Sequence, residues 1–173
     1  LGEGALDAVV IALPAPADLA VAPLFEDRFV LAGSAAQITA LGGAPPRPEA
    51  MAPERLLLLD DGHCLADQSL AACGLAREAT RVDMRASSLA TLCRLVGEGF
   101  GLTLLPEIAV RAETAAAPGL ALMRFAAPEP FRTLGLARRR TGADEGWFAE
   151  LAALLRAAGR TLLDEPGLAA IGR

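Results

Sequence analysis

Two cysteines nine positions apart, Cys64 and Cys73, are the residues of this chain best suited to chemistry. Cys64 directly follows His63, the only histidine in the sequence. A thiolate attacks an oxidant to give a sulfenic acid, and a second thiol converts the sulfenic acid to a disulfide. The chain has a third cysteine, and so sparse a set favours a reactive pair in a reducing compartment over a disulfide framework.

The segment that joins the two cysteines has the spacing of a helix. Ala66, Leu70 and Cys73 lie at i, i+4 and i+7, which predicts a helix over 65–77. Nine helical steps separate two Cα atoms by roughly 13 Å. A disulfide requires them within about 7 Å. Joining the two cysteines would therefore require the helix between them to unwind, which is how a two-state switch is built.

Polar residues near Cys64 are candidates for supporting roles. The free amides at the start of the predicted helix favour negative charge there. His63 would either add positive charge or a hydrogen bond beside Cys64, or simply bond its own turn. Asp67 lies one helical turn further on, and its charge opposes ionisation, so we expect it to position another group. The spacing of these residues matches no standard zinc pattern, and we expect neither a metal nor a cofactor.

The remaining pattern predicts the elements that must hold this segment. Strands are expected at 8–13, 19–25, 28–32, 56–59, 81–86, 102–105, 120–125 and 133–137. Further helices are expected after a Ser87 or Ser88 cap, after Pro106, and after an Asp144 cap. Residues 42–53 and 112–118 are predicted loops, and 8–13 is typical of a strand buried on both faces of a parallel sheet. Strands that alternate with helices indicate an α/β fold.

Composition limits the class of protein. The 173 residues suit one domain or two small lobes, and the apolar fraction of 53% is enough for a sizeable core. A net charge of −5 argues against a nucleic-acid surface on this chain. The sequence shows neither a membrane span nor a signal peptide. Its three cysteines fit a reducing cytosol, so we expect a cytoplasmic protein. Because it opens almost directly on a strand, we expect a fragment of a longer protein.

Three other patterns have simpler interpretations. Gly97, Gly99 and Gly101 follow a predicted helix instead of leading from a strand into one, so the dinucleotide-loop hypothesis fails its context test. Arg138-Arg139-Arg140 is interpreted as a solvated strand end. Cys93 lies on the apolar stripe of its predicted helix, which indicates a core residue.

The motif Asp61-Gly62-His63-Cys64-Leu65, followed by Asp67-Gln68 and Cys73, resembles the peroxide-sensing branch of the LysR-type transcriptional regulators. A second set of residues resembles the general LysR effector-domain signature: Ser88, Val96-Gly97, Gly99, Gly101-Leu102 and Leu105-Pro106. The similarity extends from about residue 4 to 160 and includes Pro128-Glu129-Pro130 and the run from Arg132 to Leu136.

This resemblance implies a periplasmic-binding-protein-like fold of two lobes that is incomplete at its N-terminal end. Residues 1–26 and 133–165 would form part of lobe I, and 27–132 would form lobe II, followed by a frayed tail at 166–173. The family's winged helix-turn-helix is absent from this sequence. So is the first part of the effector domain.

The resemblance also implies roles for the site residues. Peroxide would oxidise Cys64, Cys73 would resolve it, and His63, Asp67 and Arg132 would support the reaction. The implied partners are hydrogen peroxide, a homodimer or tetramer, DNA and RNA polymerase through the full-length protein, and glutaredoxin or thioredoxin as reductant. The chain would then be a regulatory domain and not an enzyme. Two alternatives stay open: a thiol peroxidase, and a LysR effector domain that binds a small organic co-inducer.

Overall fold

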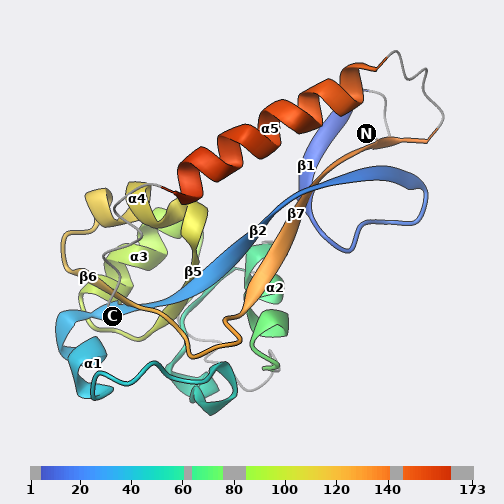
Figure 1. Ribbon diagram of the computed structural model, residues 1–173. Helices are drawn as coiled ribbons and strands as arrows, with labels where there is room; N and C mark the ends of the chain where they lie inside the picture. Colours follow the sequence, from blue (N-terminus) through green and yellow to red (C-terminus); the bar gives the residue numbers. More distant parts are fainter. Residues whose placement is uncertain (1–4, 61–63, 76–84, 141–145, 165–173) are drawn as a thin grey trace. The chain divides into compact units, whose positions relative to one another are not determined.

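The computed structural model describes residues 5–60, 64–75, 85–140 and 146–164, which form a mixed α/β fold (Figure 1). The strands are β1 (Ala8–Ala12), β2 (Leu19–Ser34), β3 (Leu58–Leu59), β4 (Arg85–Ala86), β5 (Thr103–Pro106), β6 (Leu120–Met123) and β7 (Phe131–Arg139). The helices are α1 (Ala35–Ala40), α2 (Cys64–Ala72), α3 (Leu89–Gly97), α4 (Glu107–Ala116) and α5 (Trp147–Leu163), with short 3₁₀ turns η1 (Pro48–Ala50) and η2 (Pro53–Arg55).

The chain divides into two compact units. Unit 1 is made of Leu1–Asp27 and Arg132–Glu165, and unit 2 of Arg28–Phe131 and Pro166–Arg173. Strand β2 contributes to both units, because the division falls within it. Both cysteines of the candidate site belong to unit 2, together with Cys93.

Unit 1 is built on the strand order β1-β7-β2, packed with helix α5. Strand β1 runs antiparallel to β7, with Ala8 opposite Arg138 and Ala12 opposite Leu134. The prediction of a parallel strand buried on both faces at 8–13 is therefore wrong, and Val10 is 50% exposed. The run of β-branched residues indicates a preference for extended backbone, and an extended strand need not be buried on both faces.

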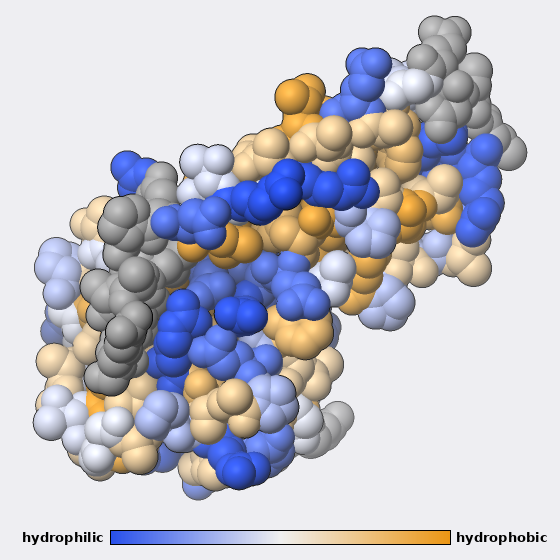
Figure 2. Space-filling view, viewed as in Figure 1, coloured by the Kyte–Doolittle hydropathy of each residue, from blue (hydrophilic) through white to orange (hydrophobic). Residues whose placement is uncertain are grey.

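Helix α5 packs one stripe into unit 1 and presents the other outward. Phe148 and Ala152 are buried in a cluster with Leu136 of β7. On the outer stripe, Leu154 is 68% exposed and Leu162 is 48% exposed. The space-filling view accordingly shows apolar and hydrophilic side chains side by side over this helix (Figure 2). No helix in the described ranges combines the length and the hydropathy needed to cross a lipid bilayer.

Unit 2 contains the larger core. The second half of β2 pairs antiparallel with β5 and β6, placing Phe29 opposite Pro106 and Leu31 opposite Met123. Strands β3 and β4 form a short parallel pair. Helix α3 begins after Ser88, whose hydroxyl accepts a hydrogen bond from the Thr91 amide, so the predicted serine cap is confirmed. The buried cluster of this unit includes the side chain of Cys73.

Several predicted boundaries are wrong, for local physical reasons. The strands expected at 19–25 and 28–32 are one strand, β2, because Asp27 is accommodated by an ion pair and does not interrupt it. The loop expected at 112–118 is helical to Ala116. Helix α5 begins at Trp147 with Gly146 as its N-cap, and the expected cap Asp144 lies outside the described residues.

Candidate functional site

Helix α2 places the two cysteines of the motif at its opposite ends. Cys64 is the first residue of the helix and is exposed, whereas Cys73 follows its last residue and is 1% exposed. Neither forms a disulfide. The helical rise keeps their Cα atoms roughly 13 Å apart, and a disulfide tolerates about 7 Å. The helix therefore keeps the two sulfurs out of reach of each other.

The C-terminal end of α2 closes in a Schellman turn with Cys73 as the C-cap. Gly74 adopts a left-handed φ of 65°. Its amide donates to the Ala71 carbonyl at 3.2 Å, and the Leu75 amide donates to the Leu70 carbonyl at 2.9 Å. The sequence predicts a helix that continues to residue 77, but α2 ends here. Its end is the left-handed backbone of Gly74, a conformation that only glycine adopts without steric cost.

The Cys73 side chain lies in the apolar core of unit 2. It belongs to the buried cluster that also contains Ala66 and Leu70 of α2. Burial, and secondly the negative charge of Glu49 on η1, raise the pKa of the Cys73 thiol to about 12. Cys73 is therefore a protonated thiol at neutral pH as long as it stays in this position. Glu49 had no distinguishing sequence signal, because its effect depends on a contact between distant segments.

The other predicted site residues are distributed over both units. Asp67 is exposed in the first turn of α2, on the same helix as Cys64. Arg132 belongs to unit 1, where its Nε and Nη2 donate to Asp27 Oδ2 at 2.9 and 2.8 Å. The expectation that Arg132 acts beside Cys64 stays a prediction. His63 lies outside the described residues.

Ser69, in the middle of α2, was not singled out by the sequence pattern. Its hydroxyl donates to the Ala66 carbonyl at 2.9 Å, and the residue is buried. A serine that bonds back to its own helix competes with the regular backbone ladder and slightly destabilises the helix. The helical segment between the two thiols thus contains a residue that weakens it.

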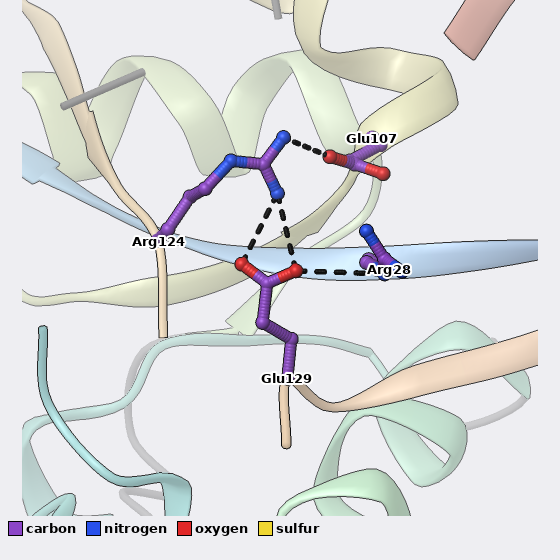
Figure 3. Close-up of polar contacts among 4 residues, drawn as sticks. All are labelled: Arg28, Glu107, Arg124 and Glu129. Carbon is purple, nitrogen blue, oxygen red and sulfur yellow. Dashed lines mark hydrogen bonds and ion pairs between the residues drawn. The ribbon is translucent and has the colours of Figure 1, made fainter. Parts of the chain in front are cut away.

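A cluster of alternating charges joins four segments of unit 2 (Figure 3). Arg124, which follows β6, contacts Glu107 of α4 at 2.6 Å and Glu129 at 3.2 Å. Arg28 of β2 reaches the same Glu129 at 3.4 Å. Sequence patterns did not predict this cluster, since its members are separated by up to about a hundred positions and share no periodicity.

Arg124 is the centre of this cluster. Burial disfavours its charged form, but the hydrogen bonds and charges of Glu107 and Glu129 outweigh that effect and raise the pKa of Arg124 above its ordinary value. The Glu107 side chain is only 8% exposed, so its carboxylate depends on this partner.

Cys93 is a core residue, as its helical stripe predicted. It is fully buried, and burial together with the nearby charge of Glu113 raises the pKa of its thiol to about 12. In the described part of the chain, no group of three histidine, cysteine or acidic side chains is arranged to hold a metal ion.

The mixed α/β fold, with an exposed thiol at the start of α2 and a buried thiol after its end, agrees with the class that the sequence predicted, a LysR-type effector domain. The chain belongs to the LysR substrate binding domain family, which matches residues 1–160. This match confirms the predicted family, and the solved structures below confirm the predicted two-lobed effector-domain fold class.

The similar proteins are named as hydrogen peroxide-inducible genes activators or as OxyR. A probable hydrogen peroxide-inducible genes activator of Mycobacterium avium is 43% identical over 157 residues, covering 90% of this chain and 50% of that protein. The DNA-binding transcriptional dual regulator OxyR of Escherichia coli K12 is 36% identical over 158 residues, covering 91% of this chain and 51% of that protein. The chain thus spans about half the length of these curated relatives.

Solved structures agree with these matches. A cysteine-to-serine mutant of OxyR from Corynebacterium glutamicum, with hydrogen peroxide bound, superposes with a TM-score of 0.81 at 34% identity. The match covers 94% of this chain and 52% of that one. The reduced OxyR regulatory domain from Pseudomonas aeruginosa gives a TM-score of 0.74 at 33% identity, covering 92% of this chain and 74% of that one.

Proposed function

We propose that this chain is the redox-sensing part of a peroxide-responsive transcriptional regulator. Cys64 is the sensing thiol and Cys73 the resolving thiol. The observation that carries the proposal is their arrangement on α2: an exposed sulfur at the helix start and a buried one at its end. One relative named above is a probable activator of hydrogen peroxide-inducible genes, and one solved structure has hydrogen peroxide bound, which supports this choice of oxidant.

The chemistry proceeds in two balanced steps. The Cys64 sulfur attacks hydrogen peroxide, the O–O bond breaks, and the products are a Cys64 sulfenic acid and one water. The Cys73 sulfur then attacks the sulfenic sulfur, an S–S bond forms, and a second water leaves. The two thiols lose two electrons, and the peroxide oxygens gain them. Glutaredoxin or thioredoxin would return the disulfide to thiols.

The second step requires refolding, because α2 holds the two cysteines roughly 13 Å apart. Unwinding of residues 64–73 would expose Leu70 and Cys73, which lie in the core when α2 is intact. The two units would be the two lobes of the effector domain. The change would alter the dimer or tetramer arrangement and hence DNA and RNA polymerase contacts of the full-length cytoplasmic protein.

His63, Asp67 and Arg132 are the proposed supporting residues. Asp67, on the same helix as Cys64, would position a neighbouring group and not activate the thiol directly, since its negative charge opposes thiolate formation. Arg132 would supply positive charge from a side chain already fixed by two bonds to Asp27.

A disulfide map before and after one equivalent of peroxide tests the proposal. Trypsin cleavage after Arg55 and Arg77 releases both cysteines in one peptide. We expect that peptide to lose the mass of two hydrogen atoms on oxidation. The Cys73→Ser variant should stop at a Cys64 sulfenic acid that dimedone traps, and Cys64→Ser should form neither product.

Cys93→Ser is the matched control and should oxidise like the original chain. Absence of the 64–73 disulfide after peroxide treatment contradicts the proposal. Sustained peroxide consumption with thioredoxin or glutaredoxin would instead favour the thiol peroxidase. A ligand response that survives Cys64→Ser would favour an organic co-inducer.

A further inference from the structure

The Schellman turn that follows α2 has a second property beyond ending the helix: it fixes where Cys73 lies. Cys73 is the C-cap, and its amide donates to the carbonyls of Ser69 and Leu70 at 3.2 and 3.1 Å. Leu75, the residue after Gly74, packs against the same buried cluster that holds Leu70 and Cys73. The backbone bonds and the apolar contacts therefore close around the Cys73 side chain together.

Gly74 is the position of this turn at which a side chain would strain the backbone. Its φ is +65°, and a Cβ added there would meet no heavy atom within 4 Å. A substitution at Gly74 would thus introduce backbone strain and no steric clash. That strain acts on the closed turn alone, because an opened segment is free to relax to an ordinary φ.

We propose that the Schellman turn at Gly74 is the latch that holds the resolving thiol in the core, and that Cys73 becomes reactive only when Gly74 and Leu75 leave this turn. Gly74 is then a positioning residue for the second oxidation step. The sensing step at Cys64 takes place nine residues away, on an exposed side chain, and is independent of the latch. The biological meaning of the latch rests on the function proposed above, but its existence does not.

Thiol alkylation in a Cys64→Ser background measures the latch directly. Cys73 is then the sole thiol in the tryptic peptide of residues 56–77, while Cys93 lies in the separate peptide of residues 86–94. Both side chains are buried in unit 2, so Cys93 reports unfolding of the unit and Cys73 reports unfolding or latch opening. We expect Gly74→Ala to speed alkylation of Cys73 about 5- to 30-fold, the factor that left-handed strain at a non-glycine residue corresponds to. Alkylation of Cys93 should be unchanged.

Two further variants separate the latch from general destabilisation. Gly42→Ala introduces the same kind of strain at φ +82° in another turn of unit 2, again with no atom near the added Cβ, and should leave Cys73 alkylation within about twofold. Gly74→Asn should fall close to the original chain, because asparagine tolerates the left-handed region better than alanine. Equal acceleration of Cys73 and Cys93 by Gly74→Ala, or equal effects of Gly42→Ala and Gly74→Ala on Cys73, would overturn the latch.

With both site cysteines present, the latch affects one step only. In a Cys73→Ser background, dimedone trapping at Cys64 after peroxide should proceed at the same rate with Gly74 or Ala at position 74. With Cys73 present, disulfide formation should be faster in Gly74→Ala. If no disulfide forms in any variant while Cys73 alkylation still rises selectively, the proposed function fails and the latch stands. If the disulfide forms but Gly74→Ala changes neither rate, the latch fails and the proposed function stands.

Discussion

At the scale of single residues, Cys73 and Cys93 are two thiols that the fold keeps protonated. Burial raises the pKa of each to about 12 from an ordinary value of 9.0, with Glu49 and Glu113 adding to the shift. The folded chain therefore holds these protons more tightly than the unfolded chain does. The stabilisation is complete below about pH 9 and is lost as the pH rises from about 9 towards 12.

This chain is well suited to a test of that loss. It contains no tyrosine, and all 16 of its basic side chains are arginine, so cysteines are the side chains that titrate in this range. We expect the free energy of unfolding, measured by urea denaturation, to fall by about 1.4 kcal/mol per pH unit for each buried thiol. Cys73→Ala should halve the slope. An unchanged slope in that variant would contradict the buried, protonated state of Cys73.

Arg124 also has a stability role that can be measured. Arg124→Ala would leave the Glu107 carboxylate, 8% exposed, without its closest partner, and we expect a loss of about 2 to 3 kcal/mol in urea unfolding. Arg28→Ala is the matched control: it removes an arginine from the same Glu129, but Arg28 is 51% exposed and should cost at most about 1 kcal/mol. Equal losses would mean that the cluster does not depend on the buried pair.

At the scale of elements, the sequence predicted helices better than their ends. The stripe of Ala66, Leu70 and Cys73 correctly indicated α2, and Ser88 correctly capped α3. Periodicity did not reveal that α2 ends before Gly74. The helical spacing continues past Gly74 in the predicted helix, whereas the left-handed φ that ends the helix depends on this one residue. The sequence pattern therefore predicted that α2 exists but not where it ends, and α2 is the helix that would unwind in the proposed switch.

Helix α5 gives an element-scale prediction of its own. Gly159 lies within this helix, and a Cβ there would overlap the ring of Phe25 on β2. Alanine gains about 1 kcal/mol of helix propensity over glycine, but overpacking costs about 1 to 3 kcal/mol. We expect Gly159→Ala to lower the melting temperature, followed by circular dichroism. In a Phe25→Leu background the same substitution should be neutral or stabilising, and a decrease of equal size there would refute the packing explanation.

At the scale of the whole molecule, local motifs predicted the family and the α/β class, and both are confirmed. Tertiary pairs were not predictable in the same way. Asp27 and Arg132 are 105 positions apart, and the Glu107–Arg124–Glu129–Arg28 cluster joins four segments. The sequence predicts two strands, at 19–25 and 28–32, where the structure has one, because a local window does not contain Arg132, the partner that lets Asp27 remain in β2.

Strand β2 also has a consequence for the order in which the chain is made. It ends at Ser34, yet the strands beside it are β5, β6 and β7, which begin at Thr103, Leu120 and Phe131. About seventy residues must therefore leave the ribosome after β2 before its first partner strand exists. Until then, β2 lacks these three partner strands, and its apolar segment from Phe29 to Ala32 lacks the part of its core that Leu102, Leu104 and Leu105 supply. Non-local pairing of this kind is slow to form, so we expect the sheet around β2 to be completed late in folding.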